Sequence, residues 1–291
     1  MILVFGLICV DRVMRIDAMP GIGGFTEIRS EETFLGGEAA NTANALSTWG
    51  VPVELHGNPI GCDVDGDWLE AQLQKRGLRV PNRIAAQTTP VCQVFVDRES
   101  NRTMFGKGFG HHPPLEELDA IPFREGDWFT ADPNLEDLAR DVVRRAEAAG
   151  MHLYLMDFFR TSDSIPAGSI WQSSTDWVGE VGNGKRNLAW VRNWTQTHGC
   201  TTILTDGARG LYAMRPGGVA TFYEPFEAET MIDSTGAGDM FRAAMIWRLS
   251  VGDAFEEALS FASAAGALKC GYLGATSYVP TEVEIRALMN A

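Results

Sequence analysis

The second half of the chain alternates between β-prone and helical segments, and this alternation restricts the possible folds more than any other feature. The segments lie at 128–130, 135–149, 151–157, 174–181, 186–198 and 201–206. Strands that alternate with helices of about ten to fifteen residues indicate βαβ units, which build a parallel sheet. Further helices are expected at 238–250, at 254–269 and after Pro280. We therefore expect an α/β fold with a central, mostly parallel sheet flanked by helices.

The first half supplies further elements and a candidate lid. The expected elements are, in order, a strand at 1–10, a helix at 38–49, a strand at 51–56 and a helix at 66–77. Two β-prone runs, 91–97 and 102–106, flank a polar turn in the pattern of a hairpin. Together with the preceding polar stretch, this hairpin predicts a small β-sheet lid formed by about 12–35 and 91–108, outside the main core.

Composition limits the partners and the setting. The 291 residues carry 38 acidic and 24 basic side chains, a formal net charge of −14. Nucleic-acid binding depends on Lys and Arg side chains that displace counterions, so nucleic acid is not an expected partner. The five cysteines form no Cys-x-x-Cys pair, which fits a reducing, cytoplasmic setting. No apolar stretch is long enough to span a membrane, and we expect a single domain over 1–291.

The sharpest chemical signal is the run Asp233-Ser-Thr-Gly-Ala-Gly-Asp239, which precedes an apolar helix. Glycines at a helix start let backbone N–H groups approach an anion, and the helix dipole adds partial positive charge. Asp239, in the first turn, is then placed to take a proton from an attacking hydroxyl. A bare Gly-x-Gly-Asp is more often a tight turn with an acidic cap. The full seven-residue run favours an anion cradle.

A second signal is the Gly36-Gly37 pair ahead of an Ala-rich helix that ends at Gly50. The pair permits close approach by a ligand, and Asn41, one turn into the helix, offers a donor and an acceptor to a hydroxyl-rich molecule. For this segment alone, a structural turn before a closely packed helix stays open as the alternative. Asp11 ends the first expected strand, a common place for an acidic residue.

A third motif, Thr205-Asp-Gly207-x-x-Gly210, follows a predicted strand. In this order and spacing, the three motifs resemble the signatures of the PfkB/ribokinase family of carbohydrate kinases, and the resemblance spans essentially the whole chain. Asp11, the pair Gly274-Ala275 and Pro280 also fall where that family has them. The resemblance implies a three-layer ribokinase-like fold with a small β lid. It also implies ATP-dependent transfer of phosphate to a hydroxyl group of a sugar or sugar acid.

The same resemblance implies roles for individual residues. Asp239 would be the general base, beside an anion hole formed by the N–H groups of Gly236, Ala237, Gly238 and Asp239. The residues that would bind the sugar are Asp11, Gly36, Gly37 and Asn41. Those that would lie along the nucleotide are Thr205, Gly207 and Gly210, with Ser263 at the adenine. Asp233 and the Thr235 carbonyl resemble the K⁺ site of several members, and Mg²⁺ would be carried mainly by the ATP phosphates.

The chain departs from the family pattern in one segment. Relatives usually carry Asn-x-x-Glu ahead of the helix that precedes the Thr-x-Gly strand, where it orders magnesium, and this chain has Trp177-Val-Gly-Glu180-Val-Gly-Asn-Gly184 instead. Glu180 is the remaining candidate there, although an isolated Glu is usually just solvated. The departure leaves a non-catalytic, sugar-sensing protein as an alternative. A sensor, however, has no need of a base at Asp239.

Two further expectations concern the acceptor and the assembly. A nucleoside kinase of the same fold is an alternative to a sugar kinase, because Phe25, Phe34 and Phe105 would supply an apolar pocket for a base. Sheets with exposed edges commonly pair with a second copy. We therefore expect a homodimer that forms through the lid.

Overall fold

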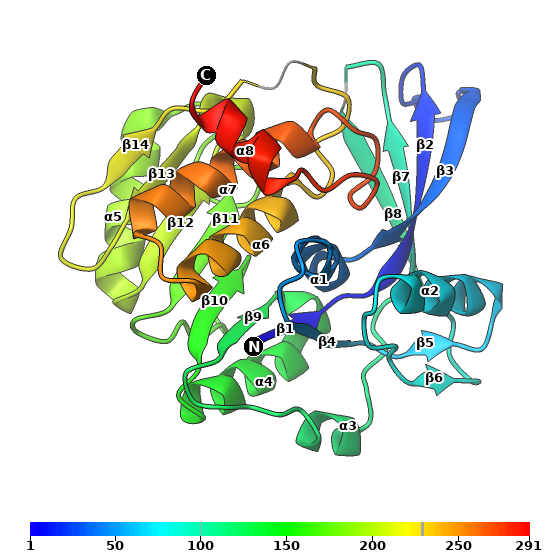
Figure 1. Cartoon of the computed structure of the whole chain (residues 1–291). Helices are drawn as coiled ribbons and strands as arrows, with labels where there is room; N and C mark the ends of the chain where they lie inside the picture. The colour runs from blue at the N-terminus through cyan, green and yellow to red at the C-terminus, as the bar shows by residue number, and fades with distance from the viewer. Residues whose placement is uncertain (100, 228–229) are drawn as a thin grey trace.

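The computed structural model of the protein describes residues 1–99, 101–227 and 230–291. Its centre is an eight-stranded sheet with the order β14-β13-β12-β11-β10-β9-β1-β4 (Figure 1). The strands are β1 (Ile2–Gly6), β4 (Val53–Gly57), β9 (Trp128–Ala131), β10 (His152–Met156), β11 (Ile170–Ser174), β12 (Thr201–Thr205), β13 (Leu211–Met214) and β14 (Thr221–Tyr223). Neighbours from β4 to β12 are parallel, and β13 pairs antiparallel with β12 and β14. The predicted, mostly parallel central sheet is confirmed.

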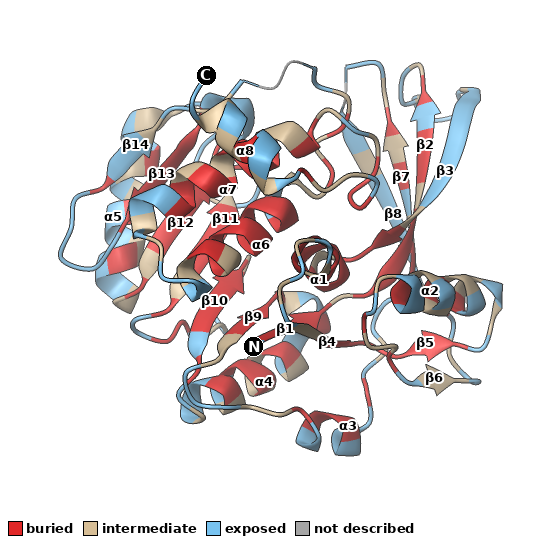
Figure 2. Ribbon diagram, viewed as in Figure 1, coloured by how far each residue is buried: buried red, intermediate tan, exposed pale blue. Residues whose placement is uncertain are grey.

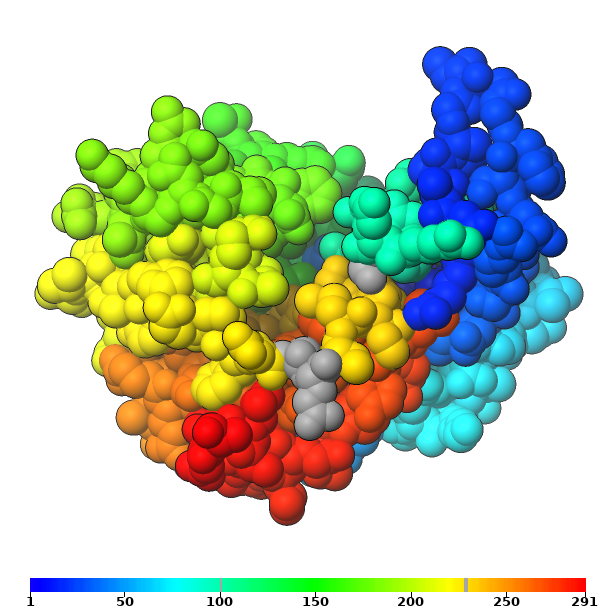
Figure 3. Space-filling view, turned by 90° about the horizontal axis from the view of Figure 1, so that it is seen from above, coloured from blue at the N-terminus to red at the C-terminus, as the bar shows by residue number. Residues whose placement is uncertain are grey.

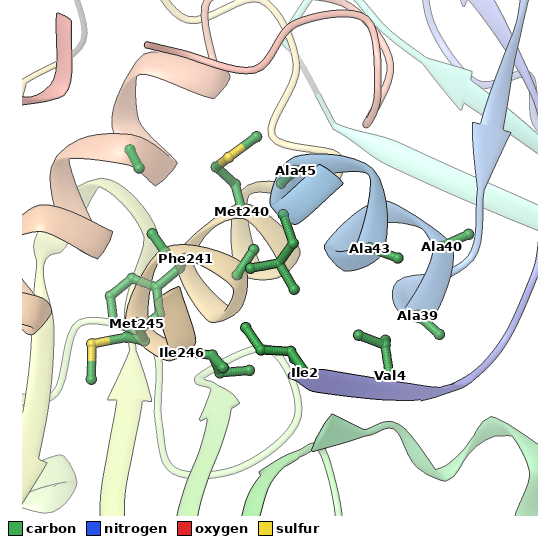
Figure 4. Close-up of a cluster of buried hydrophobic side chains, with 14 of the residues drawn as sticks. Ile2, Val4, Ala39, Ala40, Ala43, Ala45, Met240, Phe241, Met245 and Ile246 are labelled. Atoms are coloured by element: carbon green, nitrogen blue, oxygen red, sulfur yellow. The ribbon is translucent and has the colours of Figure 1, made fainter. Parts of the chain in front are cut away.

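Helices cover both faces of this sheet and complete three layers (Figure 1). One face carries α1 (Glu38–Thr48), α6 (Ala237–Ser250), α7 (Phe255–Lys269) and α8 (Glu282–Met289), and the other carries α3 (Leu115–Asp119), α4 (Glu136–Ala148) and α5 (Gly184–His198). Strand β1 contributes side chains to the hydrophobic cores on both faces of the sheet, because successive side chains of a strand point to opposite faces. Ile2 and Val4 pack toward α1 and α6 (Figure 4), whereas Leu3 and Phe5 belong to the cluster around α4. The predicted three-layer α/β fold is therefore present.

A second, four-stranded sheet stands beside the body, in the order β3-β2-β7-β8. Its strands are β2 (Cys9–Ile16), β3 (Ile28–Gly36), β7 (Val91–Val96) and β8 (Arg102–Lys107). Helix α2 (Val64–Lys75) contacts β2 and β3, and a short parallel ladder joins β5 (Ile60–Gly61) to β6 (Arg83–Ile84). Figure 2 shows that β3 is exposed along most of its length, while β2 is largely buried. The predicted smaller sheet is thus present, and its action as a lid stays a prediction.

One predicted element is wrong. The segment 174–181, assigned to the strand–helix alternation, forms mainly a turn, and the strand at this place is β11, which begins at Ile170. The sequence hides β11 because its interior contains the polar residues Gln172 and Ser173, both of which are buried. These side chains lie inside the protein because they contact other polar groups at the end of the sheet, which an apolar pattern cannot reveal.

Two further expectations from the sequence concern the cysteines and membrane-spanning segments. In the described ranges, no helix is long and apolar enough to cross a membrane. The five cysteines are free. Burial raises the pKa of the Cys9, Cys200 and Cys270 thiols, so these side chains act as packing groups rather than as nucleophiles.

Candidate active site

The candidate site lies where the parallel strands end. In open α/β sheets, ligands bind outside the carboxyl ends of the strands. Asp132 follows β9, Asp157 follows β10, and Asp206 follows β12. Figure 3 looks onto this side of the molecule, with the blue β2 and β3 standing beside the body and the teal region around β8 next to the yellow segment that leads to α6. The motif residues of α1 and α6 meet these strand ends.

The loop that opens α6 is held by the Asp233 carboxylate. Its Oδ1 accepts hydrogen bonds from the Thr235 backbone N–H at 2.8 Å and from the Thr235 hydroxyl at 2.6 Å, and its Oδ2 accepts one from the Gly274 N–H at 2.7 Å. Gly236 then adopts a left-handed conformation with φ 78°. A Cβ atom there would lie 2.6 Å from the Ala275 Cβ, so the position requires glycine. The motif thus fixes the turn from which the helix starts.

The first turn of α6 points its N–H groups out of the helix. Met240 N donates the first intrahelical bond to the Gly236 carbonyl at 2.9 Å, so the amides of Gly238 and Asp239 precede the helical ladder. The amide of Ala237 donates to the Ser234 carbonyl at 3.2 Å. The Gly238 and Asp239 amides, which lie ahead of the helical ladder, and the helix dipole make the start of α6 suited to an anion.

A buried glutamine anchors this helix start to the sheet. The Gln172 side chain, on β11, donates from Nε2 to the Gly238 carbonyl at 3.2 Å, and its Oε1 accepts from the Tyr154 hydroxyl at 2.6 Å. Both side chains are buried. The helix terminus therefore sits at a fixed place above β10 and β11. Sequence reasoning missed Gln172, whose one available signal is a polar residue in a β-prone run.

The Asp239 carboxyl group is buried and has two partners. Asn41 donates from Nδ2 to Oδ2 at 2.8 Å, and Arg242 lies with Nη2 at 3.3 Å from Oδ1. Burial raises the pKa of Asp239 to about 7, against the lowering effects of Arg242 and Asn41. A carboxyl group with a pKa near neutrality is suited to accept a proton during a reaction.

Arg242 is a fully buried guanidinium at the centre of several carboxyl groups. Its Nε donates to the Thr42 hydroxyl at 2.8 Å, and its Nη2 also contacts the Glu38 carbonyl. Burial raises the pKa of Glu38, Asp132 and Asp157, and the positive charge of Arg242 opposes that rise in each. The sequence pattern does not predict this cluster, because a charged residue inside a helix normally lies on the solvent side.

Two of these acids depend on local backbone features. The Asp132 carboxylate accepts the Leu7 N–H at 3.2 Å, and a Cβ on Gly6 would lie 1.9 Å from its Oδ2, so Gly6 leaves the room that this carboxylate occupies. Asp157 has a positive φ of 62°, uncommon for a residue other than glycine, and Ser173 donates to its carboxylate. The available signal in the sequence was an acid at or just beyond the end of each of two predicted strands.

Three buried polar atoms around Asp239 have no hydrogen-bond partner among the described residues. They are Asn41 Oδ1, Glu38 Oε2 and Arg242 Nη1. Buried polar atoms are normally paired, because leaving one unpaired costs free energy. Their gathering beside Asp239 indicates a place where a polar molecule supplies the missing partners.

The predicted sugar-binding residues lie at the junction of β2, β3 and α1. A Cβ on Gly36 would lie 2.1 Å from the Asp11 Cγ, so Gly36 makes room for this carboxylate. Gly37, with φ 92°, begins α1 against the Leu7 carbonyl, which a Cβ would approach to 2.3 Å. Burial raises the pKa of Asp11 to about 6. The structure joins Asn41 directly to Asp239, which the sequence did not predict.

Three of the predicted nucleotide residues, Thr205, Gly207 and Gly210, lie at the end of β12 and in the turn after it. Asp206 is buried and accepts from the Thr175 hydroxyl at 2.7 Å and from the Gly182 N–H at 3.0 Å, and the short helical turn Gly207–Arg209 follows it. Thr205 pairs in register with Ser174 of β11, the strand whose Gln172 anchors the start of α6. Ser263 lies in α7, which packs along α6.

Other predicted positions lie apart from this centre. Phe25, in the connection between β2 and β3, is 90% exposed, and Phe105 is half exposed and packs edge-on against Phe95. Phe34 packs against Gly274. Glu180 is paired with Arg186 at the surface.

Comparison with known proteins gives consistent matches. The model of the pfkB family carbohydrate kinases matches residues 1–116 and 176–282. An uncharacterized sugar kinase of Dictyostelium discoideum is 27% identical, over 96% of this chain and 94% of the relative. The ATP-dependent ribose-1-phosphate kinase of Halopiger xanaduensis is 28% identical, over 96% and 95%.

Solved structures show the same fold. The ribokinase of Giardia lamblia superposes with a TM-score of 0.83 at 18% identity, over 99% of this chain and 98% of that one. The Arabidopsis thaliana ribokinase complexed with ribose and ATP gives 0.80 at 18% identity, over 100% and 98%. Both similarities extend over the central sheet and the smaller one.

Proposed function

Because the chain belongs to the pfkB family of carbohydrate kinases, we propose that it transfers the γ-phosphoryl group of ATP to a hydroxyl group of a sugar or sugar acid. The observation that carries the proposal is the Asp239 carboxyl group, buried at the start of α6 with its pKa raised to about 7. It stands beside backbone donors suited to a phosphoryl group, which is the pairing that phosphoryl transfer to an alcohol requires.

In the proposed reaction, Asp239 takes the proton of the acceptor hydroxyl. The hydroxyl oxygen bonds to the γ-phosphorus while the bond from that phosphorus to the ADP oxygen breaks, and ADP leaves with the electron pair. The N–H groups of Gly236, Gly238 and Asp239 stabilise the charge on the transferred group. We leave out the Ala237 N–H, the fourth donor expected from the sequence, because it donates to the Ser234 carbonyl. Asn41 and Arg242 orient the Asp239 carboxylate through its two oxygens.

The two substrates enter from different sides of Asp239. We place the acceptor between Asp11, Gly36, Gly37 and Asn41, beneath the smaller sheet, and the nucleotide along Thr205, Gly207, Gly210 and Ser263. Magnesium enters as the MgATP substrate. Glu180 is held by Arg186 at the surface, so we assign the metal contacts to the nucleotide phosphates rather than to this residue.

A nucleoside acceptor is the second candidate. The aminoimidazole riboside kinase of Salmonella typhimurium is 26% identical over 88% of this chain. Of the three phenylalanines expected to form a base pocket, Phe34 packs against the glycine that Asp233 binds, whereas Phe25 is largely in solvent. The base pocket therefore has weaker support than the site for a hydroxyl-rich acceptor.

ADP release with MgATP, measured against a panel of sugars, sugar acids, sugar phosphates and nucleosides, tests the proposal. We expect turnover with at least one sugar or sugar acid and its loss in Asp239→Asn. Asp137→Asn is the matched control, because Asp137 has an exposed carboxylate on α4, paired with Arg140 of the same helix. Silence on every acceptor, together with sugar-dependent thermal stabilisation, would favour the sensing alternative instead.

We also retain the homodimer through the smaller sheet as a proposal. Strands β3 and β8 are its two edges. Its outer part exposes the apolar side chains Met19, Ile22, Phe25, Met104 and Phe105. Such a surface at the edges of a sheet is suited to binding a second copy of the chain. Light scattering tests this, and we expect the mass of a dimer.

A further inference from the structure

A fully buried lysine lies beside the anion cradle and takes no part in the reaction described above. Lys269 ends α7 and has 0% exposure, which places it among the largest completely buried side chains of the protein. An ammonium group is costly to bury unless charges and hydrogen bonds compensate it. Its position therefore calls for an explanation.

The ammonium group bridges two loops through their carbonyls. Its Nζ donates to the Asp233 carbonyl at 3.3 Å and to the Tyr272 carbonyl at 3.1 Å. The same loops are also joined by the Asp233 N–H, which donates to the Cys270 carbonyl at 3.1 Å, and by the Gly274 N–H on the Asp233 carboxylate. Lys269 thus sits at the centre of the connection that fixes the start of α6.

Several negative groups lie near the buried ammonium group. Burial lowers the pKa of Lys269, and the positive charge of Arg102 adds to this, whereas the negative charges of Asp233 and Asp239 and the Cys270 thiol oppose it. A cation at this place compensates the Asp233 carboxylate, which is fully buried. It also adds positive charge behind the helix start that faces the phosphoryl group.

The K⁺ site suggested by the sequence, the Asp233 carboxylate with the Thr235 carbonyl, would compete with these contacts at Asp233. Both carboxylate oxygens of Asp233 already accept hydrogen bonds from Thr235 and Gly274. Its backbone carbonyl, which would have been available to a metal ion, accepts the Lys269 ammonium. A positive charge with carbonyl partners is therefore already present, and it is covalently part of the chain.

We propose that the Lys269 ammonium group serves as a built-in monovalent cation, so that the protein needs no K⁺ to order its anion cradle. Lys269 is a positioning residue, acting through Asp233 on the Thr235–Gly236 turn. The tests of this inference by kinase activity rest on the proposed function. The tests by thermal midpoint do not depend on it.

The first test uses the unmodified protein. Kinase activity and thermal midpoint are measured in KCl, NaCl and choline chloride at equal ionic strength. We expect kcat/KM to agree within about twofold among the salts, since no ion is bound, and the thermal midpoint to show no preference for K⁺. A fall of about tenfold or more in choline chloride, or a K⁺-specific rise of the midpoint, would overturn the proposal.

The second test removes the ammonium group. In Lys269→Met we expect activity in choline chloride to fall by about 10- to 100-fold, as for loss of a group that orients a site. K⁺ or NH₄⁺ should restore part of that loss and raise the thermal midpoint more than choline does. Lys75→Met, at an exposed lysine on α2, is the control and should behave like the unmodified protein.

The outcomes separate the two proposals. A folded Lys269→Met protein with full activity in choline chloride, or one that K⁺ neither reactivates nor stabilises, contradicts the role given to Lys269. If Lys269→Met does not fold, the salt series on the unmodified protein decides the matter alone. If no acceptor is phosphorylated, the proposed function fails, and the comparison of thermal midpoints still tests the built-in cation.

Discussion

Removing the charge of Arg242 should raise the pKa of Asp239, the proposed general base. Among the groups that lower the pKa of Asp239, Arg242 has the largest effect. At the Nη2–Oδ1 separation of 3.3 Å, two unit charges interact by about 5 kcal/mol at an effective dielectric constant of about 20. Delocalisation over both groups reduces this value, so we expect Arg242→Gln to raise the pKa by at least about one unit, or 1.4 kcal/mol.

The assay is the pH dependence of kcat/KM between about pH 5 and pH 10. A general base works in its ionised form, so activity falls as the pH drops below the pKa of Asp239, which is about 7. The midpoint of this acid limb should move to higher pH in Arg242→Gln. In Arg242→Lys, which keeps the positive charge, it should move less.

Arg242→Gln also leaves buried carboxyl groups without their cation. Breaking a buried ion pair in this way costs about 3–5 kcal/mol, so circular dichroism must first establish a temperature at which the variant is folded. A folded Arg242→Gln protein whose acid limb stays where it is in the unmodified protein would refute the coupling between Arg242 and Asp239. An equal shift in Arg242→Lys would also refute it.

Two further predictions concern the acceptor side and the stability of the fold. Gly36→Ala places a Cβ atom 2.1 Å from the Asp11 Cγ, so KM for the acceptor should rise by about tenfold or more. Gly21→Ala, which meets no atom within 4 Å, should leave KM unchanged, and equal values for the two variants would contradict the role of Asp11. The folded-state pKa of Asp239 is about 7 against 3.8 for an ordinary Asp, so its contribution to stability is lost as pH rises through about 7. Asp239→Asn should therefore resist urea better than the unmodified protein above about pH 7, by a few kcal/mol, and not below about pH 4. Equal urea stability of the two proteins above about pH 7 would contradict the raised pKa of Asp239.

The parts of the site that the sequence predicted are those with a local cause. The turn before α6 depends on glycines at fixed positions, since Gly236 has a positive φ. The parallel sheet follows from the alternation of strands and helices. Both features are set by residues close together in the chain, so a pattern of a few residues is enough to predict them.

The parts that the sequence did not predict depend on tertiary burial. Arg242 lies one turn after Asp239 in a helix, where a charged residue is normally solvated, and it is buried because α1 packs over it and supplies Thr42 and Glu38 as partners. In the sequence, Lys269 has the position of an ordinary basic residue in the last turn of a helix. Its contact with Asp233 becomes evident only when the two loops are folded together.

The most direct test of the account is a comparison of one phosphoryl transfer in the unmodified protein and in Asp239→Asn, each loaded with MgATP before the acceptor is added. We expect the transfer rate to fall by about 10²- to 10⁴-fold in Asp239→Asn, while the dissociation constant for ATP stays within about twofold. A transfer rate close to that of the unmodified protein would contradict the assignment of Asp239 as the base. A loss fully explained by weaker ATP binding would contradict it as well.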